Sequence, residues 1–139
     1  MTVELLNPSD LASYKDLIDE CFGTSNDLSF YERYSKNKGY FVFVVKNCDE
    51  IVGSITQYNI DLFTFNFQPS LMLFNIAVKP TFRKNGIARF LLEYIIENAK
   101  KDGYHSISLT CLEDAYGAHK LYESLGFKKA NSVKYDLRF

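Results

Sequence analysis

The sequence predicts a single α/β domain built on a mixed, mostly antiparallel sheet with helices on both faces. Strand-like and helix-like segments alternate along the chain, residues 71–78 are almost continuously apolar, and a strongly amphipathic helix separates that run from the next strand. This central strand–helix–strand unit is expected to pair in parallel with a right-handed crossover. The 139 residues are 47% hydrophobic and contain no repeat or linker, so residues 1–139 are expected to form one domain.

The first predicted elements are a strand and a helix. Residues 2–6 have the composition of a short strand, and Asn7 or Ser9 can cap the helix that follows, because their side-chain oxygens accept hydrogen bonds from free N–H groups. Apolar residues three and four positions apart define one face of that helix: Leu11, Tyr14, Leu17, Ile18 and Cys21. Gly23 is expected to end it.

A weaker helix and a β-hairpin follow. Residues 27–35 have a weak helical pattern. Residues 40–45 are β-branched and aromatic, which favours a strand. A turn at 47–50 then returns the chain as a partner strand over 51–58.

The next two elements have the most regular patterns. Residues 71–78 are apolar except for Asn75, as expected for a strand covered on both faces, and residues 79–80 end it. The helix predicted over 86–101 has an apolar stripe at Ala88, Leu91, Leu92, Ile95, Ile96 and Ala99. Gly103 then stops that helix.

The last predicted elements are shorter. Residues 106–111 alternate as a strand, and residues 114–125 form a final helix closed by Gly126. Residues 133–137 are predicted to be a last strand. The complete predicted order is β-α-α-β-β-β-α-β-α-β.

Charge and composition exclude several classes of protein. Lys and Arg number 16 against 17 Asp and Glu, a balance that argues against a nucleic-acid interface. No apolar run approaches the roughly 20 residues that a membrane span requires. The first residues lack the basic flank and apolar stretch of a secretory signal, so a cytoplasmic protein without membrane association is expected.

The cysteines and histidines predict no metal site. Cys21, Cys48 and Cys111 have no C-x-x-C spacing, and no cluster of ligand residues surrounds His105 or His119. Both histidines are expected at the surface. Cys111 is expected to be a small buried thiol, because a nucleophilic role would need a base beside it and none is evident.

One junction has the character of a phosphate site. An apolar strand ends at Val78, and a strong helix begins after Arg83, Lys84 and Gly86. The first N–H groups of a helix have no partner within it and carry partial positive charge, and glycine lets a bulky anion approach them. A well-capped helix on a solvated corner has the same local composition. These features alone therefore leave both phosphate binding and plain capping open.

Two longer segments supply a family resemblance. The first is Asn75-Ile76-Ala77-Val78-Lys79-Pro80 followed by Arg83-x-x-Gly86-x-Ala88, and the second is Ala118-His119-Lys120-Leu121-Tyr122-Glu123-Ser124-Leu125-Gly126-Phe127. In this order, with a strand between them, they resemble the GNAT superfamily of acyl-CoA-dependent N-acetyltransferases. The predicted order of elements extends the resemblance over essentially the whole chain.

The resemblance implies that acetyl-CoA is the acyl donor. Backbone N–H groups of the loop would bind its pyrophosphate, at Lys84, Asn85, Gly86, Ile87, Ala88 and Arg89, with Arg83 at the head of the loop. The preceding strand would bulge away from its neighbour and offer a free edge to the pantetheine arm at Ile76, Ala77 and Val78. The N–H of Ile76 would also polarise the thioester carbonyl, on which negative charge develops during acyl transfer.

The resemblance also implies a general acid and leaves the general base open. Tyr122 would protonate the departing CoA thiolate, since a phenol is protonated at neutral pH. Its place on an apolar stripe also fits a plain core aromatic. An amine must lose a proton before it attacks, and the best acidic candidate is Asp61. The alternatives are Glu20, Asp27 and Glu32.

The resemblance therefore favours an N-acetyltransferase that moves an acetyl group to a primary amine of a small molecule or a protein. Direct attack in a ternary complex is expected, because no activated nucleophile is evident. A catalytically inactive CoA-binding sensor or regulatory module of the same fold is the alternative. Ala115 stands where the family often has an asparagine that contacts the cofactor. A nucleotide-binding enzyme with the same phosphate cradle is a second alternative.

Aromatic residues are abundant and gather in two places. Both groups lie where the family builds its acceptor site: Phe30, Tyr31 and Tyr34 in the second helix, and Phe63, Phe65 and Phe67 near the strand turn. Residues 63–67 alternate strictly between phenylalanine and polar residues, which predicts an extended hairpin arm with an apolar face. That face is expected in the core or in a homodimer interface more than in a substrate pocket.

Overall fold

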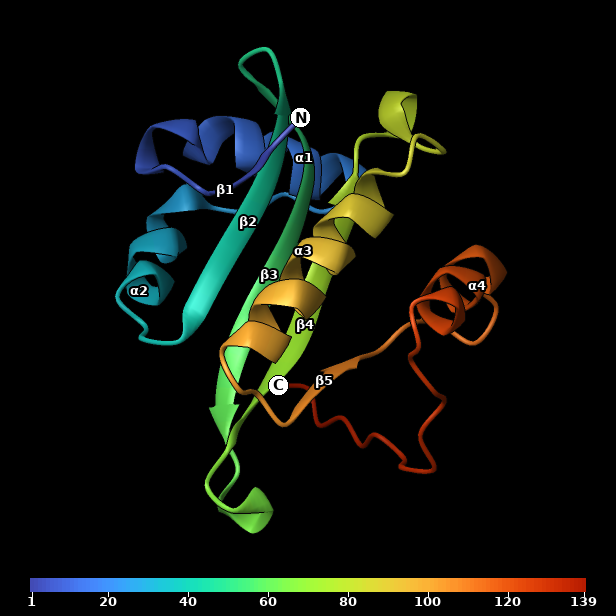
Figure 1. Ribbon diagram of the computed structural model, residues 1–139. Helices are drawn as coiled ribbons and strands as arrows, with labels where there is room; N and C mark the ends of the chain where they lie inside the picture. The colour runs from blue at the N-terminus through green and yellow to red at the C-terminus, as the bar shows by residue number, and fades with distance from the viewer.

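A five-stranded sheet in the order β1-β2-β3-β4-β5 forms the body of the protein, and helices cover both of its faces (Figure 1). The computed structural model describes residues 1–139, with the side chains of all of them except Tyr34 and Ser35. The strands are β1 (Val3–Leu5), β2 (Tyr40–Asn47), β3 (Glu50–Asp61), β4 (Pro69–Val78) and β5 (Ser106–Leu109). The helices are α1 (Leu11–Phe22), α2 (Tyr31–Ser35), α3 (Ile87–Lys101) and α4 (Tyr116–Ser124). Neighbouring strands are antiparallel except β4 and β5, which are parallel and joined through α3, so the predicted mixed α/β fold is confirmed.

Two hydrophobic clusters hold the sheet between α1 and α3. The α3 cluster comprises Val45, Val52, Ile55, Leu71, Leu73, Ile87, Leu91, Leu92, Ile95 and Ala99. The α1 cluster comprises Tyr14, Leu17, Val42, Val44, Ile51 and Ala77. Because β2, β3 and β4 contribute side chains to both clusters, the middle of the sheet is covered on both faces.

A β-bulge near the end of β4 reverses the faces that its side chains occupy. The β3–β4 register shifts between Ser54 and Thr56, which leaves two β4 residues, Asn75 and Ile76, opposite one β3 residue. Asn75 takes a left-handed conformation, with φ of 51°, which asparagine tolerates better than most residues. Odd-numbered residues before the bulge face the α3 cluster, whereas Ala77 after it faces the α1 cluster. One extra residue inverts the alternation, as expected for a side-chain period of two.

The end of β4 has a free edge. β5 pairs with β4 only over residues 70–73. Residues 74–78 therefore have no partner on the β5 side, and in Figure 1 the chain after β5 leads away from β4 toward α4. Backbone N–H and C=O groups on such an edge are available to an extended ligand.

The chain after α4 forms no strand. The predicted strand over 133–137 is wrong: residues 127–139 contain neither helix nor strand, and Val133, Tyr135 and Leu137 are 75%, 91% and 81% exposed. Their alternation has no layer to bury against, because β5 pairs with β4 alone and no residue of this segment joins the sheet.

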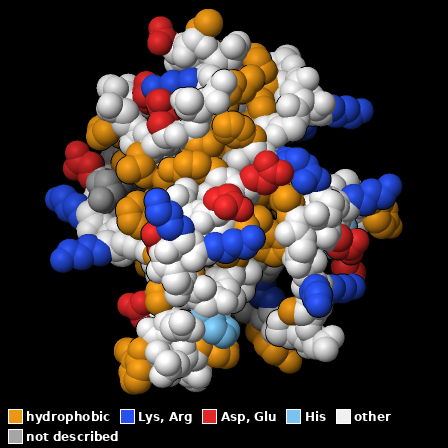
Figure 2. Space-filling view, viewed as in Figure 1, with side chains coloured by type: hydrophobic (Ala, Val, Ile, Leu, Met, Phe, Trp, Pro, Cys, Tyr) orange, Lys and Arg blue, Asp and Glu red, His pale blue; other side chains and the backbone are white. Residues whose placement is uncertain are grey.

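The predicted extended arm at 63–67 is also wrong. Phe63–Phe65 form a turn of 3-10 helix between β3 and β4, and Asn66 and Phe67 follow in the left-handed conformation. The rings of Phe63 and Phe67 meet edge to face at 5.1 Å, and both side chains are more than two-thirds exposed. Figure 2 shows hydrophobic side chains gathered at this lower tip of the molecule. A homodimer interface at the tip stays a prediction.

Because of Tyr14, the stability of the fold is expected to fall at alkaline pH. Burial raises the pKa of its phenol to about 12 from an ordinary value of 10.0. The folded state thus favours the neutral phenol, so this contribution is fully present below pH 10 and is lost as the pH rises through 12. Between pH 10 and pH 12, the unfolding free energy of the wild-type protein should fall by about 2 kcal/mol more than that of Tyr14→Phe. Chemical denaturation of both proteins across this range measures the difference. Parallel pH profiles for the two proteins would contradict this expectation.

Candidate active site

A cleft of ≈ 770 Å³ opens where the free edge of β4, the start of α3 and one face of α4 meet. Predicted site residues line it from three elements: Ile76, Ala77 and Val78 from β4; Arg83, Lys84, Gly86, Ile87, Ala88 and Arg89 from the loop and α3; and Tyr122 from α4. The strand edge, the helix N-terminus and the predicted acid therefore open into one space. Asn85 does not line this space.

The loop before α3 presents uncapped backbone amides to the cleft. Gly86 precedes the helix in the left-handed conformation, with φ of 78°, and no side chain caps the N-terminus. A Cβ added at Gly86 would meet nothing within 4 Å, so the space in front of these amides is open. The side-chain amide of Asn85 instead donates to the carbonyl of Phe82 at 3.1 Å and braces the turn.

Three cationic side chains surround these amides. The Arg83 Nε donates to the carbonyl of Val78 at 3.0 Å, which holds the guanidinium beside the strand edge. The Arg89 Nη2 donates to the Ser124 hydroxyl at 2.5 Å and so connects α3 to α4. Lys84 is exposed. Open amides at a helix N-terminus, ringed by positive charge, fit a diphosphate group.

Gly53 on β3 positions this loop, although the sequence analysis did not single it out. A Cβ at this position would lie 2.5 Å from the Cγ2 of Ile87, the first residue of α3, and 3.5 Å from the Cδ1 of Leu91. Only a glycine lets the start of α3 pack this closely on the sheet. The available signal was a glycine between Val52 and Ser54 inside a predicted strand.

Tyr122 lies on the inner side of α4. Its ring packs against the α3 cluster and meets the ring of Phe127 edge to face at 6.0 Å. Burial raises the pKa of Tyr122, and the nearby Cys111 raises it further, so the phenol stays protonated at neutral pH. Among the described residues, none hydrogen-bonds to its hydroxyl. The side chain is therefore a packed aromatic that also keeps a free O–H donor.

The structure does not bring the candidate bases to the cleft. Asp61 pairs with Pro69, seven residues before Ile76 on β4, which is roughly 23 Å along the strand. Glu20 lines a separate hollow beside α1. The Asp27 carboxylate accepts a hydrogen bond from the Ser29 N–H, which lowers its pKa and caps a short turn. Glu32 is exposed, and it too is absent from the cleft lining. The Tyr34 side chain lies outside the described part of the chain.

The structure corrects the expectations for Cys111 and His119. Cys111 is exposed rather than buried, and His119 is half-buried rather than a surface residue. The Cys111 Sγ lies 3.7 Å from the Nε2 and 3.9 Å from the Nδ1 of His119. A base does therefore stand beside this thiol.

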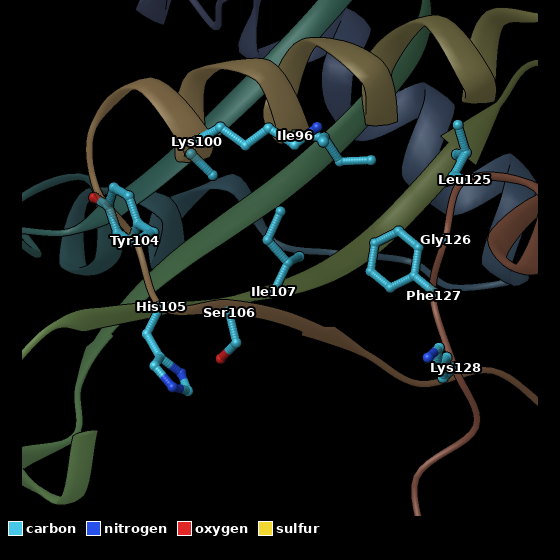
Figure 3. Close-up of a pocket in the computed structure, with 11 residues that line it drawn as sticks. Ile96, Lys100, Tyr104, His105, Ser106, Ile107, Leu125, Gly126, Phe127 and Lys128 are labelled. Carbon is cyan, nitrogen blue, oxygen red and sulfur yellow. The ribbon is translucent and has the colours of Figure 1, made fainter.

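Two further cavities follow the cleft. The first, ≈ 320 Å³, lies between β5, α4 and the chain after it, and it shares Tyr122 with the cleft. The second, ≈ 430 Å³, lies under the end of α3 and shares Ile107, Phe127 and Lys128 with the first. Figure 3 shows Ile107 and Phe127 pointing into the second cavity below Ile96, whereas His105 and Ser106 point away from it. The rings of Tyr122 and Phe127 thus stand at the borders between consecutive cavities.

No group of His, Cys, Asp or Glu side chains that could hold a metal ion occurs among the described residues. None of the helices in that part of the chain has the length and apolar character needed to span a bilayer.

Comparisons with known proteins identify a matching sequence family and a shared fold. The sequence model described as "Acetyltransferase (GNAT) family" matches residues 10–127. A [Ribosomal protein bS18]-alanine N-acetyltransferase of Escherichia coli is 43% identical over 58 residues, which cover 42% of this chain and 39% of that protein. N-acetyltransferase 8 of Homo sapiens is 29% identical over 96 residues, covering 69% and 42% of the two chains. The chain thus matches less than half the length of these relatives.

Solved structures share the fold over the whole chain. A putative acetyltransferase from Agrobacterium tumefaciens superposes with a TM-score of 0.89 at 19% identity, covering 100% of both chains. A ribosomal-protein-alanine N-acetyltransferase from Brucella melitensis gives a TM-score of 0.83, also at 19% identity and covering 100% of both chains. At 19% identity these matches show a shared fold and no more.

Proposed function

Because the chain belongs to the GNAT acetyltransferase family, we propose that it moves an acetyl group from acetyl-CoA to a primary amine of a small molecule or a protein, by direct attack in a ternary complex. One observation carries the proposal. The free edge of β4, the uncapped N-terminus of α3 and the residue Tyr122 of α4 all line a single cleft.

Each wall of the cleft has a part in the proposed reaction. The loop amides of Lys84 and of residues 86–89 hold the diphosphate of the donor, and the β4 edge pairs with its extended arm. The N–H of Ile76 donates to the thioester oxygen, where negative charge develops. The amine nitrogen bonds to the acyl carbon, the carbon–sulfur bond breaks, and the Tyr122 hydroxyl donates its proton to the leaving thiolate.

A specific observation keeps the CoA-binding sensor as a second candidate. None of the described side chains lining the cleft is a carboxylate, so the proposed transfer lacks an acidic base there. A panel of small amines and peptide N-termini, tested with acetyl-CoA for release of free thiol, separates the candidates. Amine-dependent release supports the transferase. CoA binding without any release supports the sensor and would refute the proposed reaction.

The loop glycine offers a direct test of where the donor binds. Gly86→Val places a branched side chain in the open space before the amides and strains a left-handed residue. We expect CoA affinity, measured by calorimetry, to fall at least about tenfold, which is about 1.4 kcal/mol.

Gly103 at the other end of α3 provides a matched control. Its φ is 76°, and a Cβ there also meets nothing within 4 Å. Gly103→Val should therefore carry a similar backbone strain and a similar loss of stability, with CoA affinity unchanged. Equal CoA affinities for the two variants would remove the loop from the binding site.

A further inference from the structure

Cys111 and His119 form a thiol–imidazole pair that the proposed transfer does not use. Cys111 lies two residues beyond β5, and His119 lies in the first half of α4. The sulfur is 3.7 Å and 3.9 Å from the two ring nitrogens, within the range of a hydrogen bond to sulfur. The two segments thus place a nucleophile and a base side by side.

The surroundings of the ring assign its protons. The His119 Nε2 lies 3.0 Å from the carbonyl oxygen of Leu112 and 3.1 Å from that of Glu113. A carbonyl only accepts hydrogen bonds, so Nε2 carries the hydrogen and Nδ1 is the free acceptor in the neutral ring. The Cys111 sulfur lies almost equidistant from the two nitrogens, so the thiol must turn into line with Nδ1 before that nitrogen takes its proton, and the two carbonyls then stabilise the cation that results. A base oriented by a third group beside a nucleophile is the arrangement that activates catalytic thiols.

The pair adjoins the proposed acyl-transfer cleft. Cys111, His119 and Tyr122 all line the cavity of ≈ 320 Å³, and Tyr122 lines the cleft as well. Only the Tyr122 side chain is common to both spaces. The thiol therefore lies in the cavity next to the cleft in which the thioester is proposed to bind, with the Tyr122 side chain at the border between the two.

The other two cysteines lack this activation. The Cys21 thiol lies in the cleft wall and donates to the carbonyl of Val78 at 3.4 Å, and the Arg83 guanidinium beside it can stabilise a thiolate but cannot take the thiol proton as a base does. Cys48 is exposed in the turn between β2 and β3, where no described histidine or other base contacts it. The chain thus contains its own comparison thiols, one in the cleft and one on the surface.

We propose that Cys111, activated by His119, is a second acyl acceptor that takes the acetyl group from acetyl-CoA when no amine is bound. The proposal rests on the proposed function, which brings the thioester to Tyr122. The thiol proton moves to the Nδ1 of His119, and the sulfur attacks the acyl carbon. The bond from that carbon to the CoA sulfur breaks, and the leaving thiolate takes the proton from the imidazolium. One thioester replaces another, without oxidation or reduction.

Mass spectrometry of the full chain tests this acylation. Incubation with acetyl-CoA and no amine should add one acetyl group, located on the peptide that contains Cys111 and removed by neutral hydroxylamine, which cleaves thioesters. His119→Gln removes the proton acceptor and should slow labelling at least about tenfold. Cys48→Ser should label at the wild-type rate.

Several results would overturn the proposal: labelling on Cys21 or Cys48 instead of Cys111, labelling that survives hydroxylamine, or an unchanged rate in His119→Gln. A short acetyl thioester without the nucleotide part is run in parallel. Cys111 should react with it faster than Cys48 does, and equal rates would refute the activation by His119. CoA calorimetry and amine-dependent thiol release on the same preparation identify the cause of a negative result. Binding and release without label refute this inference alone, whereas loss of CoA binding refutes the proposed function.

Discussion

Replacing Tyr122 with phenylalanine is expected to lower amine-dependent turnover at least about tenfold while acetyl-CoA affinity changes little. The substitution removes only the hydroxyl, and the ring keeps its contact with Phe127 and the α3 cluster. Among the described residues no hydrogen bond to that hydroxyl exists, so the unfolding free energy should also stay nearly constant. Steady-state kinetics at saturating donor, with denaturation curves on the same samples, measures both quantities.

Tyr116 provides the control for this substitution. It begins the same helix, is 73% exposed, and is absent from the cleft lining. Tyr116→Phe should leave turnover, donor affinity and stability unchanged. If Tyr122→Phe also turned over at the wild-type rate, Tyr122 would be a packing residue, and the leaving thiolate would need another proton source.

Gly53→Ala is expected to weaken both the fold and donor binding. The new Cβ would lie 2.5 Å from the Cγ2 of Ile87, so the start of α3 must shift or its side chain must leave a favourable rotamer. Overpacking of this kind costs about 1–3 kcal/mol in stability. Because Ile87 and the neighbouring Gly86 also line the cleft, the same shift moves the loop amides and should raise the dissociation constant for CoA.

A double-mutant cycle isolates this contact. Ile87→Ala alone removes buried volume and should destabilise the protein, yet in the Gly53→Ala background it relieves the collision. The double variant should therefore be more stable than the sum of the two single effects implies. Strict additivity of the two losses would show that Gly53 does not set the position of α3.

Local signals in the sequence accounted for most of the elements. The Asn7 side chain accepts the Ser9 N–H at 3.0 Å and caps the 3-10 turn that leads into α1, whose own N-cap, Asp10, makes no side-chain cap. Gly23 ends α1 in the left-handed conformation. The apolar stripe of α3 was predicted from spacing alone, and its members Leu91, Leu92 and Ile95 are almost completely buried. The glycine and basic residues of the loop were likewise readable, because they are consecutive in the chain.

Features that depend on distant pairs were not readable. The face reversal after Asn75 depends on the register against β3, and the close approach at Gly53 depends on α3, which begins more than thirty residues later. Asp61 was a reasonable base by residue type, but the strand pairing carries it to the far end of β4. Residues 133–137 alternate as a strand would, but no other strand pairs with them. Alternation without a hydrogen-bonded neighbouring strand does not make a β-strand.

The pairing of Cys111 with His119 depends on short-range structure of a different kind. Their positions differ by eight in the sequence, and the turn between β5 and α4 brings their side chains together. Neither a helical nor a strand period predicts this contact. The carbonyls that orient the ring belong to the same turn. Every residue has a backbone carbonyl, so the sequence does not indicate which of them contacts the ring.

The loose attachment of α4 has a thermodynamic consequence for the cleft. None of its residues is fully buried, and its ties to α3 include a single described side-chain hydrogen bond, from Arg89 to Ser124. Elements with so little buried surface undock at a lower free-energy cost than the core. A donor spanning β4, α3 and α4 acts as a cross-link that selects the docked arrangement. The apparent dissociation constant for the donor therefore depends on the fraction of molecules with α4 docked, as well as on the affinity of the docked cleft itself.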